Sequence, residues 1–65
     1  MPSSVIARIK YDDSTSSLLV YYLSGAVYAY KNVPVETYEE MRRAFSKGQF
    51  LNTRIKGYFE YEKIS

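Results

Sequence analysis

The sequence predicts a small α+β domain in which three antiparallel strands precede a helix, a short helical turn and a last strand. Apolar and polar residues alternate along residues 5–11 and again along residues 58–64, as in strands, whereas apolar residues recur at helical spacing after Pro34. The pair Ser24-Gly25 interrupts a run of uncharged, strand-forming residues and marks the turn of a hairpin. Sixty-five residues suit one folding unit, so we assign residues 1–65 to a single domain.

The first strand is expected at residues 5–11, after a short polar lead at residues 1–4. The polar cluster at residues 12–16 then forms a turn, because side chains of these types bond their own backbone. Strict alternation would put Val5, Ala7, Ile9 and Tyr11 on one face of this strand, and Ile6, Arg8 and Lys10 on the other.

Residues 18–30 are expected to form two strands that fold back at Ser24-Gly25. A two-residue turn would put Tyr21 and Tyr28 on one face, whereas a three-residue turn at residues 23–25 would pair Tyr22 with Ala26. We favour the three-residue turn, because it needs a positive φ only at its last residue, where glycine fits. One face then carries Leu18, Val20, Tyr22, Tyr28 and Tyr30, and the other carries Leu19, Tyr21, Val27, Ala29 and Lys31.

An amphipathic helix is expected from Val35 to about Lys47, with Pro34 before it and Gly48 as its C-terminal stop. A short helical turn and a final strand at an edge of the sheet would follow, separated by Gly57. The apolar stripe of the helix would consist of Val35, Tyr38, Met41 and Phe45, and that of the short turn of Phe50, Leu51 and Ile55.

The composition argues against catalysis and against a resident metal or cofactor. The chain has no cysteine and no histidine, so it lacks the commonest metal ligands and the usual general base. No glycine-rich phosphate loop is present, and the acidic turn at Asp12-Asp13 is at best a weak cation site. The uncharged run at residues 14–30 is too polar and too interrupted for a membrane span or a signal peptide. We expect a soluble cytoplasmic protein that is not an enzyme.

The order of these segments resembles the KTSC domain, a module named for the C-terminus of some lysine–tRNA synthetases that also occurs as a stand-alone bacterial or phage protein. The resemblance rests on Tyr11-Asp12, Leu18-x-Val20-x-Tyr22-x-x-Gly25-x-x-Tyr28-x-Tyr30, Val33-Pro34, Tyr38 and Ala44-x-Ser46-x-Gly48-x-Phe50-x-Asn52-x-x-Ile55. It implies a small, partly open antiparallel β-barrel of the Sm-like or SH3-like kind with a helix, and the synthetase context suggests RNA binding. The counterparts of its most specific residues are Tyr28, Tyr30, Gly48, Phe50 and Asn52, which we interpret as structural.

Three of these residues also allow a functional interpretation. Tyr28 and Tyr30 could stack on nucleobases, but their place beside Leu18 and Val20 favours a role in the core. Asn52 could contact a base, although an asparagine in a tight turn more often bonds nearby backbone.

The opposite face of the sheet is the predicted binding surface. A tyrosine ring among cations suits single-stranded nucleic acid, and cations near the short helical turn could hold phosphate. The candidate nucleic-acid-binding residues are Arg8, Lys10, Tyr21, Lys31, Arg54 and Lys56.

The same face carries apolar residues, which favours a homodimer or a higher oligomer instead. A third interpretation is a simple cation–π contact of Arg8 with Tyr21. The sequence thus predicts a binding module for RNA or another single-stranded nucleic acid or, alternatively, a homo-oligomeric structural or protein-interaction adaptor, for example a phage-encoded one. The candidate oligomer contacts are Ile6, Leu19, Tyr21, Leu23 and Val27.

Overall fold

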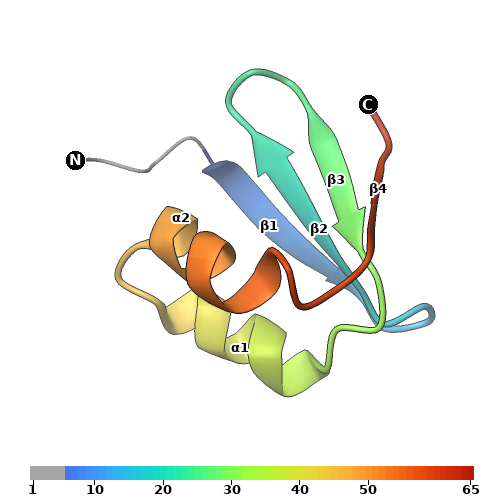
Figure 1. The fold of residues 1–65 in the computed structure, drawn as a ribbon, viewed down its shortest axis with the longest axis vertical. Coiled ribbons are helices and arrows are strands. Elements are labelled where there is room, and N and C mark those ends of the chain that lie inside the picture. Colours follow the sequence, from blue (N-terminus) through green and yellow to red (C-terminus); the bar gives the residue numbers. More distant parts are fainter. Residues whose placement is uncertain (1–5) are drawn as a thin grey trace.

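Four strands form one antiparallel sheet, and the helices all pack on one of its faces (Figure 1). The computed structural model describes residues 6–65. The strands follow one another in space as they do in the chain: β1 (Ile6–Asp12), β2 (Ser17–Tyr22), β3 (Val27–Tyr30) and β4 (Tyr61–Lys63). Between β3 and β4 lie α1 (Val35–Arg43), α2 (Lys47–Phe50) and the π-helical turn η1 (Leu51–Ile55).

The predicted α+β order of strands and helices is confirmed, and the sheet is open. β1 and β4 occupy its two edges and do not pair with each other, so the sheet does not close into a barrel. Its likeness to an Sm or SH3 barrel stays a prediction. Val5 and the polar lead before it lie outside the described residues. Within residues 6–65, no helix is both long and apolar enough to cross a membrane.

The three-residue turn predicted for the central hairpin is confirmed. The Tyr22 N–H donates to the Ala26 carbonyl over 2.9 Å, and the Gly25 N–H donates to the Tyr22 carbonyl over 2.9 Å. Gly25 has a φ of +98°, a value that residues with a Cβ rarely adopt. This register places Val20 opposite Tyr28. The face predicted to point inward does so: Leu18, Val20 and Tyr30 are buried, and Tyr22 and Tyr28 pack against them.

The alternation predicted for β1 is wrong at its beginning. The register shifts between Ile6 and Arg8, so that Ile6 comes opposite Tyr22 whereas Arg8 comes opposite Tyr21. A bulge of this kind inserts one extra residue and reverses the faces that precede it. Ile6 therefore packs against the core instead of joining the opposite face, and Ala7 is exposed. From Arg8 onward the predicted faces are confirmed.

The single helix predicted from Val35 to Lys47 is wrong in its second half. α1 ends at Arg43, and Ala44 is already extended, with φ −67° and ψ 141°. Ser46 then begins α2 as its N-cap, because its hydroxyl accepts a hydrogen bond from the Gln49 N–H over 3.2 Å. Gly48, predicted as the stop of the helix, is buried inside α2 instead. Phe45, predicted to cover the sheet, lies in the connection and is fully exposed.

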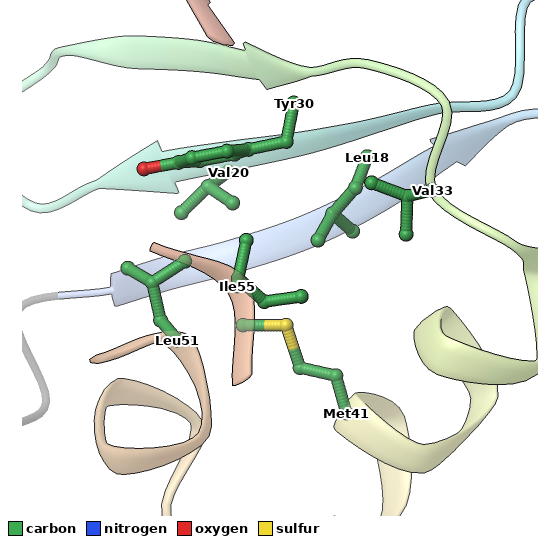
Figure 2. Close-up of a cluster of buried hydrophobic side chains, with 7 residues drawn as sticks. All are labelled: Leu18, Val20, Tyr30, Val33, Met41, Leu51 and Ile55. Carbon is green, nitrogen blue, oxygen red and sulfur yellow. The ribbon is translucent and has the colours of Figure 1, made fainter. Parts of the chain in front are cut away.

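The core forms where α1 and η1 meet the middle of the sheet. Met41 from α1 and Leu51 and Ile55 from η1 point toward the side chains of β2 and β3 (Figure 2). Beside this cluster, the Tyr11 hydroxyl donates to the Val33 carbonyl over 2.6 Å. The buried cluster consists of Leu18, Val20, Tyr30, Val33, Met41, Leu51 and Ile55.

Met41 and Phe45 share the predicted helical stripe but should differ sharply on substitution. Met41 is 0% exposed, so Met41→Ala should leave a cavity and cost about 2–5 kcal/mol of the free energy of unfolding. Phe45→Ala should change that free energy by less than about 0.5 kcal/mol, because Phe45 contacts solvent. Thermal melts measure both variants. Equal losses would mean that α1 continues through Phe45 and covers the sheet.

Gly25 should tolerate alanine poorly for a purely conformational reason. A Cβ at Gly25 would meet no atom within 4 Å, so Gly25→Ala creates no clash. Its positive φ alone should cost roughly 1–2 kcal/mol. Ser24→Ala, at an exposed position in the same turn, is the control and should be neutral. Denaturant titration of both variants is the measurement, and a neutral Gly25→Ala would argue against this turn.

Candidate functional site

A groove of about 980 Å³ lies between the β2–β3 hairpin and the segment that joins η1 to β4. We call it the tyrosine groove. Figure 1 shows how this segment leaves the helices and runs beside β3. Six of the residues that line the groove are aromatic, and the complete lining is Tyr22, Ser24, Ala26, Tyr28, Tyr30, Lys56, Gly57, Tyr58, Phe59, Glu60 and Tyr61.

The path of the chain after η1 explains why the groove exists. Gly57, with a φ of +85°, turns the chain back over the end of η1. The N–H groups of Tyr58 and Phe59 both donate to the Ile55 carbonyl, over 3.1 and 3.3 Å. The chain then reaches β4, where Tyr61 pairs with Tyr30 of β3. The segment thus bridges the helical layer and the sheet edge and leaves a hollow beneath it.

Four of the six rings in the tyrosine groove contact one another in a continuous row. Tyr22 and Tyr28 meet edge to face, with centroids 5.4 Å apart and planes at 83°. Tyr61 lies 5.5 Å from Tyr28 and 5.6 Å from Tyr30. Tyr30 is only 2% exposed, whereas Tyr61 is 60% and Tyr58 71% exposed. The groove therefore has a buried aromatic floor and exposed aromatic walls.

The hydroxyls at the floor of the groove hold their protons tightly. Burial is the main cause that raises the pKa of Tyr30, followed by the charge of Tyr22 and a hydrogen bond with it. Burial likewise raises the pKa of Tyr22, partly offset by the hydrogen bond with Tyr30. Both groups are neutral at physiological pH, so the floor of the groove presents uncharged phenols.

Cations stand at the margin of the groove. Lys56 lines it together with one carboxylate, Glu60. Lys63 comes opposite Tyr28 in the sheet register and so shares its face. Among residues 6–65, neither Lys56 nor Lys63 takes part in an ion pair.

The six candidate nucleic-acid-binding residues predicted from the sequence do not lie together. Four of them are on the sheet face that points away from the helices, which we call the outer face. Lys56 lies in the tyrosine groove instead. Arg54 projects from η1, pairs with Glu40 over 2.8 Å, and lies 5.1 Å above the ring of Phe50. The outer face carries Arg8, Lys10, Leu19, Tyr21, Val27, Ala29, Lys31 and Glu62.

The cationic residues of the outer face are partly engaged. The Arg8 guanidinium lies 4.5 Å above the ring of Tyr21, so the cation–π contact considered from the sequence is confirmed. Lys31 pairs with Glu62 over 3.1 Å. Tyr21 thus has one ring face covered, and Lys10 of the outer face has neither an ion pair nor a ring contact among residues 6–65.

The predicted oligomer contacts are also divided. Leu19, Tyr21 and Val27 are half-buried on the outer face, and Leu23 is 69% exposed at the hairpin tip. Ile6 packs against the core on the inner face instead, because the bulge in β1 reverses the direction of its side chain.

The residues of the KTSC motif occupy several environments. Tyr30 is in the core, Tyr28 packs against the core and lines the groove, and Phe50 packs against the core below Arg54. Gly48 is buried in α2. Asn52 is exposed on η1, and within residues 6–65 its side chain makes no hydrogen bond, so the expected bond to nearby backbone is absent.

Four residues at the groove are absent from the site predicted from the sequence: Tyr58, Phe59, Tyr61 and Lys63. Alternation along residues 58–64 was sufficient to predict a strand, but it did not show which sheet edge that strand joins. The pairing with β3 brings Tyr61 beside Tyr28 and Tyr30. The signal that could have identified the site is the density of aromatic residues just after Gly57.

The acidic turn after β1 is a local structural feature. One Asp12 carboxylate oxygen accepts hydrogen bonds from the Ser14 N–H over 3.0 Å and from the Ser14 hydroxyl over 2.7 Å. These bonds lower the pKa of Asp12. Across residues 6–65, no three acidic side chains come together as a metal site would require.

The raised pKa of Tyr30 predicts a loss of stability in alkali. The full contribution is present below the ordinary tyrosine pKa of about 10. Above it the unfolded chain ionises, while folded Tyr30 keeps its proton, so the free energy of unfolding falls as the pH rises toward the raised pKa. Thermal melts across this range measure the fall. Tyr30→Phe should flatten it, and an unchanged slope in that variant would contradict the assignment.

Comparison with known proteins places this geometry in a family. The KTSC domain model matches residues 2–59. The lysine–tRNA ligases of Trichormus variabilis and Nostoc punctiforme are each 42% identical to this chain over 62 residues, which is 95% of the chain and 11% of each ligase. The chain thus spans about a ninth of the length of these relatives. The crystal structure of KTSC domain protein YPO2434 from Yersinia pestis superposes with a TM-score of 0.90 at 34% identity, over 100% of this chain and 92% of that one. This chain belongs to the KTSC domain family.

Proposed function

We propose that this domain is a non-catalytic binding module that holds a single-stranded stretch of RNA in the tyrosine groove. The observation that carries the proposal is the exposure of Tyr58 and Tyr61 on the walls of a groove whose floor is also aromatic. Large aromatic rings left open to solvent in a hollow are typical of binding sites.

Stacking on nucleobases is the interaction that such rings suit. Every base has a π-face, and stacking on an aromatic side chain contributes about 1–3 kcal/mol per base. Tyr61 is supported from behind by the rings of Tyr28 and Tyr30, so its position is largely fixed before a ligand arrives. A preorganised ring loses little conformational freedom on binding.

The charges near the groove agree with a polyanionic ligand. Lys56, which lines the groove, and Lys63, which shares the sheet face of Tyr28, have no ion pair among residues 6–65 and are therefore available to phosphates. The negative charge of Glu60, which also lines the groove, partly offsets these positive charges. The net charge of +2 and the pI near 8.9 are compatible with this mode. Relatives named lysine–tRNA ligase contain a matching segment, which supports RNA as the first ligand to test.

Substitution of the groove walls should separate this site from the rest of the surface. Tyr58→Ala and Tyr61→Ala should each weaken binding of a short single-stranded RNA by about 5- to 150-fold, which corresponds to one lost stack. Phe45→Ala removes a fully exposed ring outside the groove and should bind as the wild type does. Fluorescence anisotropy measures the affinities, and thermal melts check that each variant folds.

Three further measurements complete this experiment. Lys56→Gln should reduce the slope of log affinity against log salt by about one, as expected for one lost phosphate contact. If Arg8→Ala or Tyr21→Ala loses binding while the groove variants keep it, the outer face is the RNA site. If the domain binds a proline-rich peptide, which also suits aromatic grooves, and binds no RNA, the proposed ligand class is wrong.

A further inference from the structure

We propose that the outer face binds a second copy of this chain, with β1 of each copy lying over β4 of the other. This surface is on the opposite side of the sheet from the tyrosine groove and does not depend on the function proposed for that groove. It is a four-stranded face that no helix covers (Figure 1).

The centre of the outer face is apolar, as an interface core requires. Leu19 and Tyr21 of β2 and Val27 and Ala29 of β3 occupy the two middle strands. The register makes two rows across the sheet: Tyr21 stands beside Val27, and Leu19 beside Ala29. No charged side chain of the outer face lies on these strands before Lys31, which follows the end of β3.

The two edges of the same face carry opposite charges. On the β1 edge, Arg8 begins the first row and Lys10 begins the second. On the β4 edge, Glu62 ends the second row, opposite Ala29. The second row therefore runs from a cation through two apolar residues to an anion: Lys10, Leu19, Ala29, Glu62.

This charge pattern selects one symmetric arrangement. A two-fold axis parallel to the strands and between β2 and β3 reverses the strand order of the second copy. Lys10 then faces the partner's Glu62, and the symmetry repeats this contact. A two-fold axis perpendicular to the strands would instead put the cations of β1 over the same cations of the partner. The first arrangement also places the partner's Val27 over Tyr21.

The existing contacts leave this arrangement available. Glu62 already pairs with Lys31, but its side chain is 65% exposed, and a carboxylate can accept from a second cation. In this arrangement Asp12 of one copy would approach the partner's Glu60 only at the edge of the interface, and both side chains are exposed to solvent. A standard interface buries about 800 Å² per partner, roughly a fifth of the 4452 Å² surface of this chain. Because the interface would be confined to one four-stranded sheet face, we expect the dimer to dissociate on dilution.

A pair of charge reversals tests the arrangement. Sedimentation velocity over a dilution series should show a concentration-dependent dimer for the wild type. Lys10→Glu and Glu62→Lys should each be monomeric, because each places like charges in both symmetric contacts. Mixed in equal amounts, the two variants should form a heterodimer, because every new carboxylate then faces a new lysine. Arg43→Glu reverses a 71%-exposed cation on α1, away from the outer face, and should dimerise as the wild type does.

Each other outcome overturns the proposal. A wild type that stays monomeric at all concentrations removes the dimer. Single variants that dimerise normally, or a mixture that stays monomeric, remove the contact between Lys10 and Glu62. Circular dichroism confirms that the variants are folded. If Glu62→Lys does not fold, Lys10→Glu decides alone: high salt screens the repulsion and should restore its dimer, and failure to do so contradicts the arrangement.

Discussion

The pairing of β2 with β3 is the constraint on which the other features of this domain depend. Successive residues of a strand point to opposite faces, so a slip of one residue in this pairing would exchange the two faces completely. The turn through Gly25 prevents the slip, because its positive φ closes a three-residue connection and pairs Tyr22 with Ala26. Leu18, Val20 and Tyr30 then point together toward the helices. The core, the tyrosine groove and the outer face all follow from this register.

The length of the helical layer decides which part of the inner face becomes a site. α1 ends at Arg43, and α2 with η1 adds only two short turns, so the helices cover the middle of the sheet. Toward the hairpin tip the inner face borders the groove, whose opposite side is formed by residues 56–61. Tyr22 and Tyr28 are consequently packed on one side and open on the other. The aromatic groove therefore lies where the short helices do not cover the inner face of the sheet.

Local patterns in the sequence were sufficient for the fold but not for the site. The positions of the first three strands, the turn at Gly25 and the beginning of α1 at Val35 follow from periodicity and from glycine and proline chemistry, which act over a few residues. The last strand, predicted from Tyr58, begins only at Tyr61, because the chain is still turning away from η1 at Tyr58. The bulge before Arg8 has no such local signal, and the N-cap at Ser46 was outweighed by the helical spacing of Phe45. The tyrosine groove depends on which edge β4 joins, a long-range choice that alternation does not encode. The KTSC resemblance correctly indicated the family, whereas the predicted cationic set proved to be spread over both sides of the sheet.

The shortness of β4 has a consequence for cooperativity. Its three residues pair with β3 and have exposed side chains, and backbone hydrogen bonds from the Lys31 N–H to Glu60 and from the Ile64 N–H to Val27 extend the pairing at both ends. Because neighbouring strand residues face opposite ways, Tyr61 points to the groove and Glu62 to the outer face. Fraying of this one strand withdraws both side chains in the same step. A ligand that holds β4 in place in the groove therefore reduces the entropic cost of binding at the outer face. By linkage, a partner bound at the outer face reduces the cost of binding in the groove by the same amount.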